Sequence, residues 1–424
     1  MNDSGFINDY MEKKHCRVCK STALTTYLDL GKMPLVNSYV ESANDNIPCN
    51  RYPLAINYCS ECSMSQLSIV VDPSIMFKNY FYRSSISQTF VNHCAEYAEN
   101  SARRFSFKDT DLIIDIASND GACLREFKKQ GVRVLGVDPA ENLAKIAIES
   151  GVPTVAKFWN AETAGQIHTE YGKAKMITAM NVFAHVDDLD SFLAGINTLL
   201  DDDGVFAIEC PYMFNFMTNT EFDTTYHEHL SYFLLKPIMH LVKQHDMEVF
   251  DVLTVNIHGG SLRVYVKKKS SKAWDICYQN IDKLLLMEEE TGFHKTEKYI
   301  HFSVAVKKIR DDMIRLIKSI KAEGGKIAAY GASAKGNILS NYCGFGKLDI
   351  DYIIDDTPEK QGCLAPGHHI PIVAFDKLTK EPPEYLILLA WNFSRELMNK
   401  TIKYQKQGGK YIIPIPQVKV VPEE

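Results

Sequence analysis

The stretch from residue 111 to residue 138 constrains the fold of this chain more than any other segment. An apolar run at 112–116 shows no polar alternation, which is typical of a strand buried in a parallel sheet. Small residues at 117–121 form a turn, a helical pattern follows at 123–130, and a second apolar run at 132–137 ends at Asp138. Strand, tight turn, helix and strand in this order predict an α/β domain.

The turn and the acid after the second strand indicate a nucleotide-like ligand. Small residues let a ligand approach the backbone at the helix N-terminus, and the Asp138 carboxylate can accept hydrogen bonds from two ribose hydroxyls. The turn is not G-x-G-x-x-G, which disfavours a dinucleotide. It resembles the E/D-x-G-x-G-x-G loop of S-adenosylmethionine-dependent methyltransferases, with its motif positions filled by Asp115, Ala117, Asn119 and Gly121. An ordinary βαβ unit without a cofactor is the alternative.

Strands and helices keep alternating along the rest of this domain. A helical pattern precedes it at 88–105, and apolar runs predict further strands at 152–155, 175–180, 205–209, 247–255 and 261–267. Phe158 and Trp159 follow the first of these strands, where we expect them to flank an adenine. Asn181 and His185 follow the second, at the carboxyl edge where parallel sheets present their ligands.

An insertion after the strand at 205–209 carries the sequence Tyr226-His227-Glu228-His229. Two imidazoles and a carboxylate within four residues supply a base near neutral pH and a group to orient it. The spacing alone is weak, because His-x-His also occurs on exposed strands and loops that have no catalytic role. Aromatic residues on both sides can exclude water, so the quartet is the candidate for catalysis.

A second α/β unit follows a long, charged, helically periodic stretch at 272–320. Apolar runs predict its strands at 326–330, 350–354 and 385–390. The turn at 331–337 lies between the first of these strands and a helix, which makes an anion site that Lys335 can strengthen. The chain therefore holds two nucleotide-type units, and these need not bind the same ligand.

Two Cys-x2-Cys pairs precede both α/β units. Cys16 with Cys19, and Cys59 with Cys62, can each place two thiolates on one tight turn, and two such turns close a tetrahedral Zn²⁺ site. The surrounding sequence is rich in loops and has little core, so the metal would supply folding energy. Because all four positions are cysteine, we expect a structural zinc; four free cysteines are the alternative.

Length and composition exclude several other classes. A chain of 424 residues is too long for one compact core and suits two or three domains. A formal net charge of −6 argues against a broad nucleic-acid surface. We see no signal peptide and no stretch long and apolar enough to span a membrane, so we expect a cytoplasmic protein whose 11 cysteines are reduced.

The order of these motifs resembles one known family. Zinc-type cysteine pairs, an Asn-Asp-Gly turn, a Glu-His pair, His-Gly-Gly and Tyr-Gly-Ala-x-Ala-Lys follow one another along nearly the whole chain. The chain is similar to the three-domain 3-C-methyltransferases that act on nucleotide-linked 4-keto-6-deoxy sugars. The resemblance implies S-adenosylmethionine as cofactor, structural zinc, and a C-terminal domain that helps to hold the nucleotide. It implies a zinc-binding domain at 1–80, a class I, Rossmann-like methyltransferase domain at 81–270, a helical connector at 271–320 and a Rossmann-like α/β domain at 321–424.

When the functional positions of the family are matched to this sequence one by one, the resemblance implies roles for particular residues. His229 matches the family's base and Glu228 its neighbouring carboxylate, while the positions around the sugar are matched by Tyr226, Tyr80 and His185. The cofactor loop and its ribose-binding acid are matched by Asp115, Asn119, Gly121 and Asp138. The sequence departs from the family at Ala117, where glycine is usual, and at Lys157, near the adenine. We expect substrate contacts from Tyr82, His258, Gly259, Tyr330, Ala332, Lys335, Asn337, Trp391 and Asn392.

The reaction that these residues suggest is simple. A ketone at C4 acidifies the C3 hydrogen, His229 removes it, and C3 attacks the methyl group of the cofactor. Glu228 would orient the His229 ring if its carboxylate reached the second ring nitrogen. His227 is the competing base. Two alternative functions remain: a sugar O-methyltransferase, and a binding protein built around the zinc domain. We expect a monomer or weak homodimer that binds neither nucleic acid nor membrane.

Overall fold

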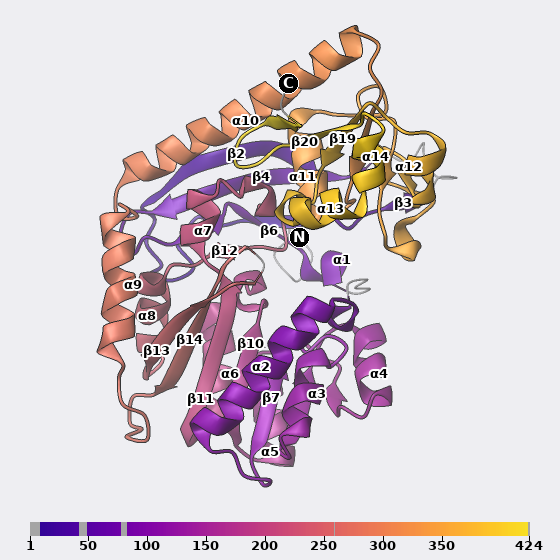
Figure 1. Ribbon diagram of the computed structural model, residues 1–424. Coiled ribbons are helices and arrows are strands. Elements are labelled where there is room, and N and C mark those ends of the chain that lie inside the picture. The colour runs from indigo at the N-terminus through magenta and orange to yellow at the C-terminus, as the bar shows by residue number, and fades with distance from the viewer. Residues whose placement is uncertain (1–8, 42–48, 78–82, 258, 423–424) are drawn as a thin grey trace.

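The computed structural model describes residues 9–41, 49–77, 83–257 and 259–422. Tyr80, Tyr82 and His258, for which we predict catalytic or substrate contacts, lie outside the described residues. Figure 1 shows an α/β unit in the lower half of the view, an antiparallel sheet above it, and a second α/β unit beside that sheet.

The lower unit is built on a seven-stranded sheet with the order β13-β14-β11-β10-β7-β8-β9. Its strands are β7 (Leu112–Ile116), β8 (Arg133–Val137), β9 (Thr154–Val155), β10 (Ala174–Met180), β11 (Leu200–Pro211), β13 (Met247–Val255) and β14 (Ser261–Lys268). All pairs are parallel except those that β14 makes with β11 and β13. The order reverses between β7 and β10, which is where open α/β sheets bind their ligands.

Helices cover both faces of this sheet (Figure 1). They are α2 (Gln88–Phe105), α3 (Ala122–Lys129), α4 (Glu141–Glu149), α5 (Ala161–Tyr171), α6 (Leu189–Leu199) and α8 (Leu235–Lys243). All five residues of β7 are buried, because Ile113 packs in one core with α2 and α3 while its neighbours Leu112 and Ile114 pack in another with α5 and α6. The predicted helix at 88–105 and strand at 112–116 are confirmed to the residue.

The N-terminal sheet is antiparallel, with the order β12-β5-β4-β2. It contains β2 (Leu24–Pro34), β4 (Arg51–Cys59), β5 (Ser65–Leu67) and β12 (Ser231–Tyr232), and beside it lie β1 (Tyr10–Glu12), β6 (Ile69–Val71) and the short helix α1 (Pro73–Phe77). The edge strand β12 comes from the insertion after β11, where Ser231 pairs with Gln66 of β5. The candidate catalytic segment is thereby fixed to the zinc-domain sheet.

The C-terminal unit holds a six-stranded sheet with the order β18-β16-β15-β19-β20-β21, parallel except for the last pair. Its strands are β15 (Ile327–Tyr330), β16 (Ile353–Ile354), β18 (Ile372–Val373), β19 (Tyr385–Leu388), β20 (Lys410–Ile413) and β21 (Lys419–Val421). Its helices are α11 (Ala334–Cys343), α12 (Asp376–Lys380), α13 (Ser394–Lys400) and α14 (Ile402–Lys406). A two-residue pairing of β17 (Cys363–Leu364) with β3 (Val40–Glu41) joins this unit to the N-terminal part.

The helical connector consists of two helices, α9 (Tyr278–Glu290) and α10 (Thr296–Ala322). The sequence pattern ran across both, but Gly292 adopts φ +84° and ends α9, as glycine often does just beyond a helix C-terminus. Figure 1 shows α10 running along one side of the molecule, across β2 and up to the C-terminal unit. Its Tyr299 ring stacks on Tyr58 of β4, with ring centres 4.0 Å apart. Among the described helices, none combines the length and the apolar character needed to cross a bilayer.

Candidate active site and zinc centre

The four predicted metal ligands lie together. The Sγ atoms of Cys16, Cys19, Cys59 and Cys62 all lie within 4.8 Å of one another. Two pairs, Cys16 with Cys62 and Cys19 with Cys59, are 3.5 Å apart. A tetrahedral Zn²⁺ with bonds of about 2.3 Å needs sulfurs about 3.8 Å apart, so the cluster fits this ion. No position is left for a substrate, which is the arrangement of a structural site.

The predicted cofactor turn, between β7 and α3, has the backbone of a glycine loop although two glycines are replaced. Ala117 has φ +56° and Asn119 has φ +54°, the left-handed region that glycine adopts most easily. Asparagine tolerates this region, while alanine pays about 1–2 kcal/mol for it. Gly121 has φ +79°, and a Cβ there would make a tight contact of 3.2 Å with the Val152 side chain. The departure at Ala117 therefore leaves the shape of the turn intact.

Asp138, just after β8, ties the turn to the second strand. Its Oδ2 accepts a hydrogen bond from the Asn119 amide at 2.8 Å, and its Oδ1 accepts one from the Ala140 amide at 2.9 Å. Burial raises the pKa of Asp138 above its ordinary value, and the two amides oppose that shift. Burial, and then the nearby charge of Asp138, raise the pKa of Asp115.

This edge of the sheet has unused hydrogen-bonding capacity. Within the described part of the chain, four buried side-chain atoms have no hydrogen-bond partner here: Asp115 Oδ1, Ser118 Oγ, Asp120 Oδ1 and Asn181 Oδ1. An unpaired buried polar atom costs roughly 1–3 kcal/mol, so such a concentration indicates atoms kept for a ligand. S-adenosylmethionine, which carries an amino group, a carboxylate and ribose hydroxyls, suits these partners.

The two aromatic residues expected beside the adenine differ in their surroundings. Phe158 is half exposed and open to a ligand. The Trp159 indole donates a hydrogen bond to the Phe192 carbonyl at 3.1 Å and packs against the Phe192 ring of α6. Its contacts are those of a packing residue.

The fold gives different surroundings to the residues of the segment 226–229: His227 and Glu228 are held by the N-terminal part, and His229 faces other groups. His227 is buried, and its Nε2 lies 3.2 Å from the carbonyl oxygen of Pro53 in β4. Burial lowers the pKa of His227 to about 4, so the ring is neutral at physiological pH. Glu228 is also buried and accepts a 2.7 Å hydrogen bond from Asn37 of the N-terminal part. These two residues hold the segment against the zinc domain.

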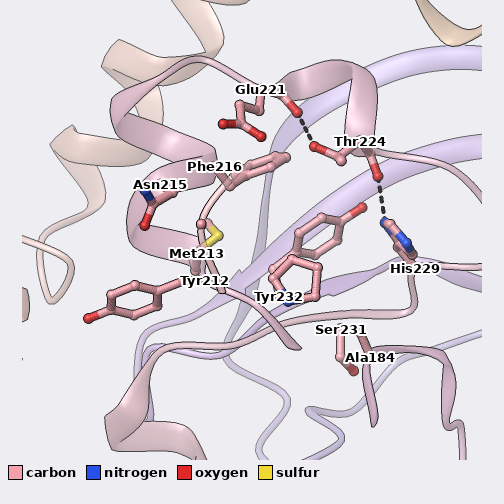
Figure 2. Close-up of a pocket in the computed structure, with 12 residues that line it drawn as sticks. Ala184, Tyr212, Met213, Asn215, Phe216, Glu221, Thr224, His229, Ser231 and Tyr232 are labelled. Carbon is pink, nitrogen blue, oxygen red and sulfur yellow. Dashed lines mark hydrogen bonds between the residues drawn. The ribbon is translucent and has the colours of Figure 1, made fainter. Parts of the chain in front are cut away.

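His229 is oriented for proton transfer by a backbone group. Its Nδ1 donates to the carbonyl oxygen of Thr224 at 2.8 Å, at the end of the 3₁₀ helix η4 (Phe222–Thr224), as Figure 2 shows. A carbonyl oxygen only accepts, so Nδ1 carries the hydrogen and the neutral ring has its basic lone pair on Nε2. We predicted that Glu228 would orient this ring if its carboxylate reached the second nitrogen, and in the structure the Nδ1 hydrogen bond runs to the Thr224 carbonyl.

The surroundings of His229 contain two of the other predicted residues. The Tyr226 ring lies against it, with centres 3.9 Å apart, and the His185 ring lies 5.0 Å away in an edge-on arrangement. Burial lowers the pKa of His185 to about 4, so His185 is neutral and can donate a hydrogen bond without carrying a charge. His229 also lines a pocket with Met213, Asn215 and Phe216 of α7 (Met213–Thr218), as Figure 2 shows. Gly260 lines the same pocket.

The low pKa of His227 gives a testable pH dependence. The ordinary pKa is 6.5 and the folded value about 4, so between these pH values the unfolded chain binds more protons than the folded chain. Folding is therefore destabilised as pH falls through this window, by up to about 3 kcal/mol from this one ring. We expect His227→Phe to lose stability less steeply than the wild type over this range, measured as urea midpoints. Equal steepness in both proteins would contradict this assignment.

The residues predicted to hold the nucleotide mostly make contacts within the protein. The Tyr330 hydroxyl donates to Asp356 at 3.0 Å. The remaining contacts run to other parts of the fold: Ala332 O accepts from Tyr39, Asn337 Nδ2 donates to Val36 O, Lys335 Nζ lies 3.5 Å from Glu221, and the Trp391 indole donates to Asp223. Asn392 is exposed, and Gly259, with φ +91°, lies so close to Glu221 that a Cβ would be 2.7 Å from its Oε2.

Sequence reasoning missed several residues of this site. Asn37, Glu221, Asp223 and Thr224 each bind a predicted site residue, or the segment that carries it. They are ordinary polar residues at unremarkable spacings, so no local pattern marks them. The one local sign of a functional role is that Glu221 and Asp223 are acidic residues within a segment that is otherwise rich in aromatic residues.

A parallel-sheet domain with this turn, a four-cysteine domain and a second α/β unit define a class: zinc-containing, S-adenosylmethionine-dependent methyltransferases. Three domain-family models match the chain in order: a zinc-binding domain at 16–77, a methyltransferase domain at 88–252, and a C-methyltransferase C-terminal domain at 256–416. The C-methyltransferase NovU of Streptomyces niveus is 32% identical over 409 residues, which cover 96% of this chain and 97% of NovU. The chain belongs to this family of C-methyltransferases, and its cofactors are S-adenosylmethionine and zinc.

Solved structures are more distant. The 1,6-didemethyltoxoflavin-N1-methyltransferase of Burkholderia thailandensis is 18% identical, with 41% of this chain and 78% of that chain covered and a TM-score of 0.31. The magnesium protoporphyrin IX methyltransferase of Synechocystis is 12% identical, with 42% and 78% covered and a TM-score of 0.30. At these scores the two structures carry no argument about this chain.

Proposed function

We propose that this enzyme transfers a methyl group from S-adenosylmethionine to C3 of a nucleotide-linked 4-keto-6-deoxy sugar. The observation that carries the proposal is the His229 ring, whose Nδ1 is held by the Thr224 carbonyl so that the basic lone pair of the neutral ring lies on Nε2. C-methylation needs a base for a carbon acid, and the family membership supplies the reaction class. The sugar is the substrate class of the family that the motifs resemble.

The bound cofactor supplies an electrophilic methyl group on a sulfonium. The C4 ketone acidifies the C3 hydrogen, and His229 Nε2 takes that proton while the electron pair of the C–H bond becomes the enolate. Neutral His185 and the Tyr226 hydroxyl, together with Tyr80, would stabilise the enolate oxygen. The C3 carbon would then form a bond to the methyl group while the sulfur–methyl bond breaks and its electron pair returns to sulfur, leaving a neutral thioether. The proton stays on His229 until solvent removes it.

In this proposal the cofactor and the nucleotide of the substrate are held by different domains. We place the cofactor in the 81–270 domain, over the turn at 115–121 with its ribose on Asp138. The nucleotide of the substrate would lie toward the 321–424 domain, where Asn392 is exposed and Lys335 of the turn at 331–337 contacts Glu221 of the insertion. Holding two reactants in line is the main contribution of such a site, since correct positioning can supply about 7–11 kcal/mol of the barrier.

The test is a product analysis. The enzyme is incubated with S-adenosylmethionine that carries a ¹³C-labelled methyl group and with thymidine diphosphate-linked 4-keto-6-deoxyglucose. The proposal predicts that NMR shows the labelled methyl bonded to C3. A methyl ether would instead identify a sugar O-methyltransferase. Binding of this probe and its uridine analogue shows which nucleoside the C-terminal domain prefers.

Replacing Asp138 tests the placement of the cofactor. We expect Asp138→Ala to weaken S-adenosylmethionine binding by about 1–3 kcal/mol, because charged hydrogen bonds to the ribose are lost and the Asn119 amide loses its partner. Titration calorimetry measures this loss. Asp109→Ala, on the exposed turn before β7, is the matched control. Equal affinity in both variants would remove Asp138 from the site.

A further inference from the structure

A buried cluster of charged and aromatic residues joins the catalytic insertion to the C-terminal unit. The indole Nε1 of Trp391, in the 3₁₀ helix η6 (Trp391–Phe393), donates to Asp223 Oδ2 at 2.6 Å. Lys335 Nζ, from the first turn of α11, lies 3.5 Å from Glu221 Oε2 and 5.3 Å from the centre of the Trp391 ring. Both acids belong to the insertion, and both of their partners belong to the C-terminal unit.

Burial makes these contacts energetically important. Asp223 is fully buried and Glu221 is 5% exposed. Burial raises the pKa of Asp223 to about 6, and Lys335 and the Trp391 indole oppose the shift. Within the described residues, Asp223 Oδ1 and Lys335 Nζ have no hydrogen-bond partner. Removing a partner from a buried charge is costly, so the segment at 221–223 is held where Lys335 and Trp391 place it.

The same segment ends at the group that orients the base. Asp223 lies within η4, and the next carbonyl, that of Thr224, accepts the hydrogen bond of His229 Nδ1. Thr224 is fixed to Glu221 in turn, because its amide donates to the Glu221 carbonyl at 3.0 Å and its hydroxyl also donates there. Figure 2 shows Thr224 between Glu221 and His229, bonded to both. A shift of residues 221–223 would therefore move the acceptor that defines the His229 tautomer.

We propose that Trp391 and Lys335 are positioning residues for the His229 base, acting through the Glu221–Thr224 segment. The inference rests on the proposed role of His229. The C-terminal unit then does more than hold the nucleotide: its docking against η4 sets the tautomer and the direction of the base. A misplaced base loses rate without losing affinity, whereas a lost nucleotide contact costs affinity.

Trp391→Phe tests this, because it keeps an aromatic ring beside Lys335 but removes the N–H donor. We expect kcat to fall about 10- to 100-fold while KM for the sugar probe and for S-adenosylmethionine stays within about 2-fold. The matched control is Trp274→Phe, whose indole donates to the carbonyl of Asp203 in β11, outside the site. A raised sugar KM at unchanged kcat would make Trp391 a substrate contact and overturn the proposal.

A second measurement needs no sugar, so it separates this inference from the proposed function. Nitrogen-15 NMR of the histidine rings, assigned with His229→Gln, should show the Nδ1–H form in the wild type and a mixture of forms in Trp391→Phe. A pair of variants at Asp223 distinguishes a loss of the hydrogen-bond acceptor from a general loss of folding. Asp223→Asn keeps an oxygen acceptor for the indole and should lose less rate than Asp223→Leu. Equal loss in the pair, or an unchanged His229 spectrum in Trp391→Phe, would contradict the positioning role.

Discussion

Replacing His229 with asparagine is expected to lower kcat about 10²- to 10⁴-fold, the usual contribution of a positioned general base. The physical reason is that asparagine can still donate to the Thr224 carbonyl but has no basic nitrogen where Nε2 lies. The fold should be preserved, because His229 is only partly buried and its segment is held by Glu228, His227 and β12. Binding of both ligands should therefore persist.

The measurement uses a keto-sugar with deuterium at C3. Wild-type enzyme should wash the label out or methylate the carbon, and His229→Asn should do neither. His227→Asn is the matched control, since its ring faces the carbonyl groups of β4 and is predicted to be structural. If His227→Asn lost turnover and His229→Asn kept it, the two roles would be exchanged. If both kept turnover, His185 or Tyr80 would be the candidate base.

Replacing Cys59 with serine is expected to remove the zinc and to destabilise the N-terminal domain severely. The metal joins the turn at 16–19 to the turn at 59–62, and metal binding in such small domains is folding free energy, about 10–16 kcal/mol in zinc-finger peptides. Serine is a poor substitute for the thiolate that zinc prefers. Activity should fall as well, because Asn37 and the β4 carbonyls of this domain hold Glu228 and His227.

Metal analysis and the thermal unfolding midpoint measure both effects. Wild-type protein should contain one zinc per chain, and Cys59→Ser should contain much less and unfold at a lower temperature. Cys49→Ser is the matched control, because Cys49 belongs to the same domain but lies outside the four-cysteine cluster. Full zinc content in Cys59→Ser would overturn the assignment.

Features that depend on residues close together in the sequence were predictable from the sequence alone. The predicted bounds of the strand at 112–116 and of the helix at 88–105 match the structure, because continuous apolar runs and helical periodicity report local burial. The cysteine spacing predicted the cluster, since a two-residue gap suits one metal-binding turn and two such turns complete a tetrahedron. Motif order along the whole chain was enough to indicate the family.

Only the tertiary structure decided which partner each buried polar group received. Asn37 meets Glu228 across 191 residues, and Trp391 meets Asp223 across 168. The spacing of the motif does not distinguish His227 from His229, and the resemblance alone ranked His229 first. Packing against β4 made His227 a buried structural ring and left His229 beside Tyr226 and His185. Backbone geometry likewise kept the glycine-loop shape at Ala117. Local patterns predict which groups are buried, but hydrogen-bond and ion-pair partners are chosen by contacts between distant segments, and these exist only once the three parts have packed together.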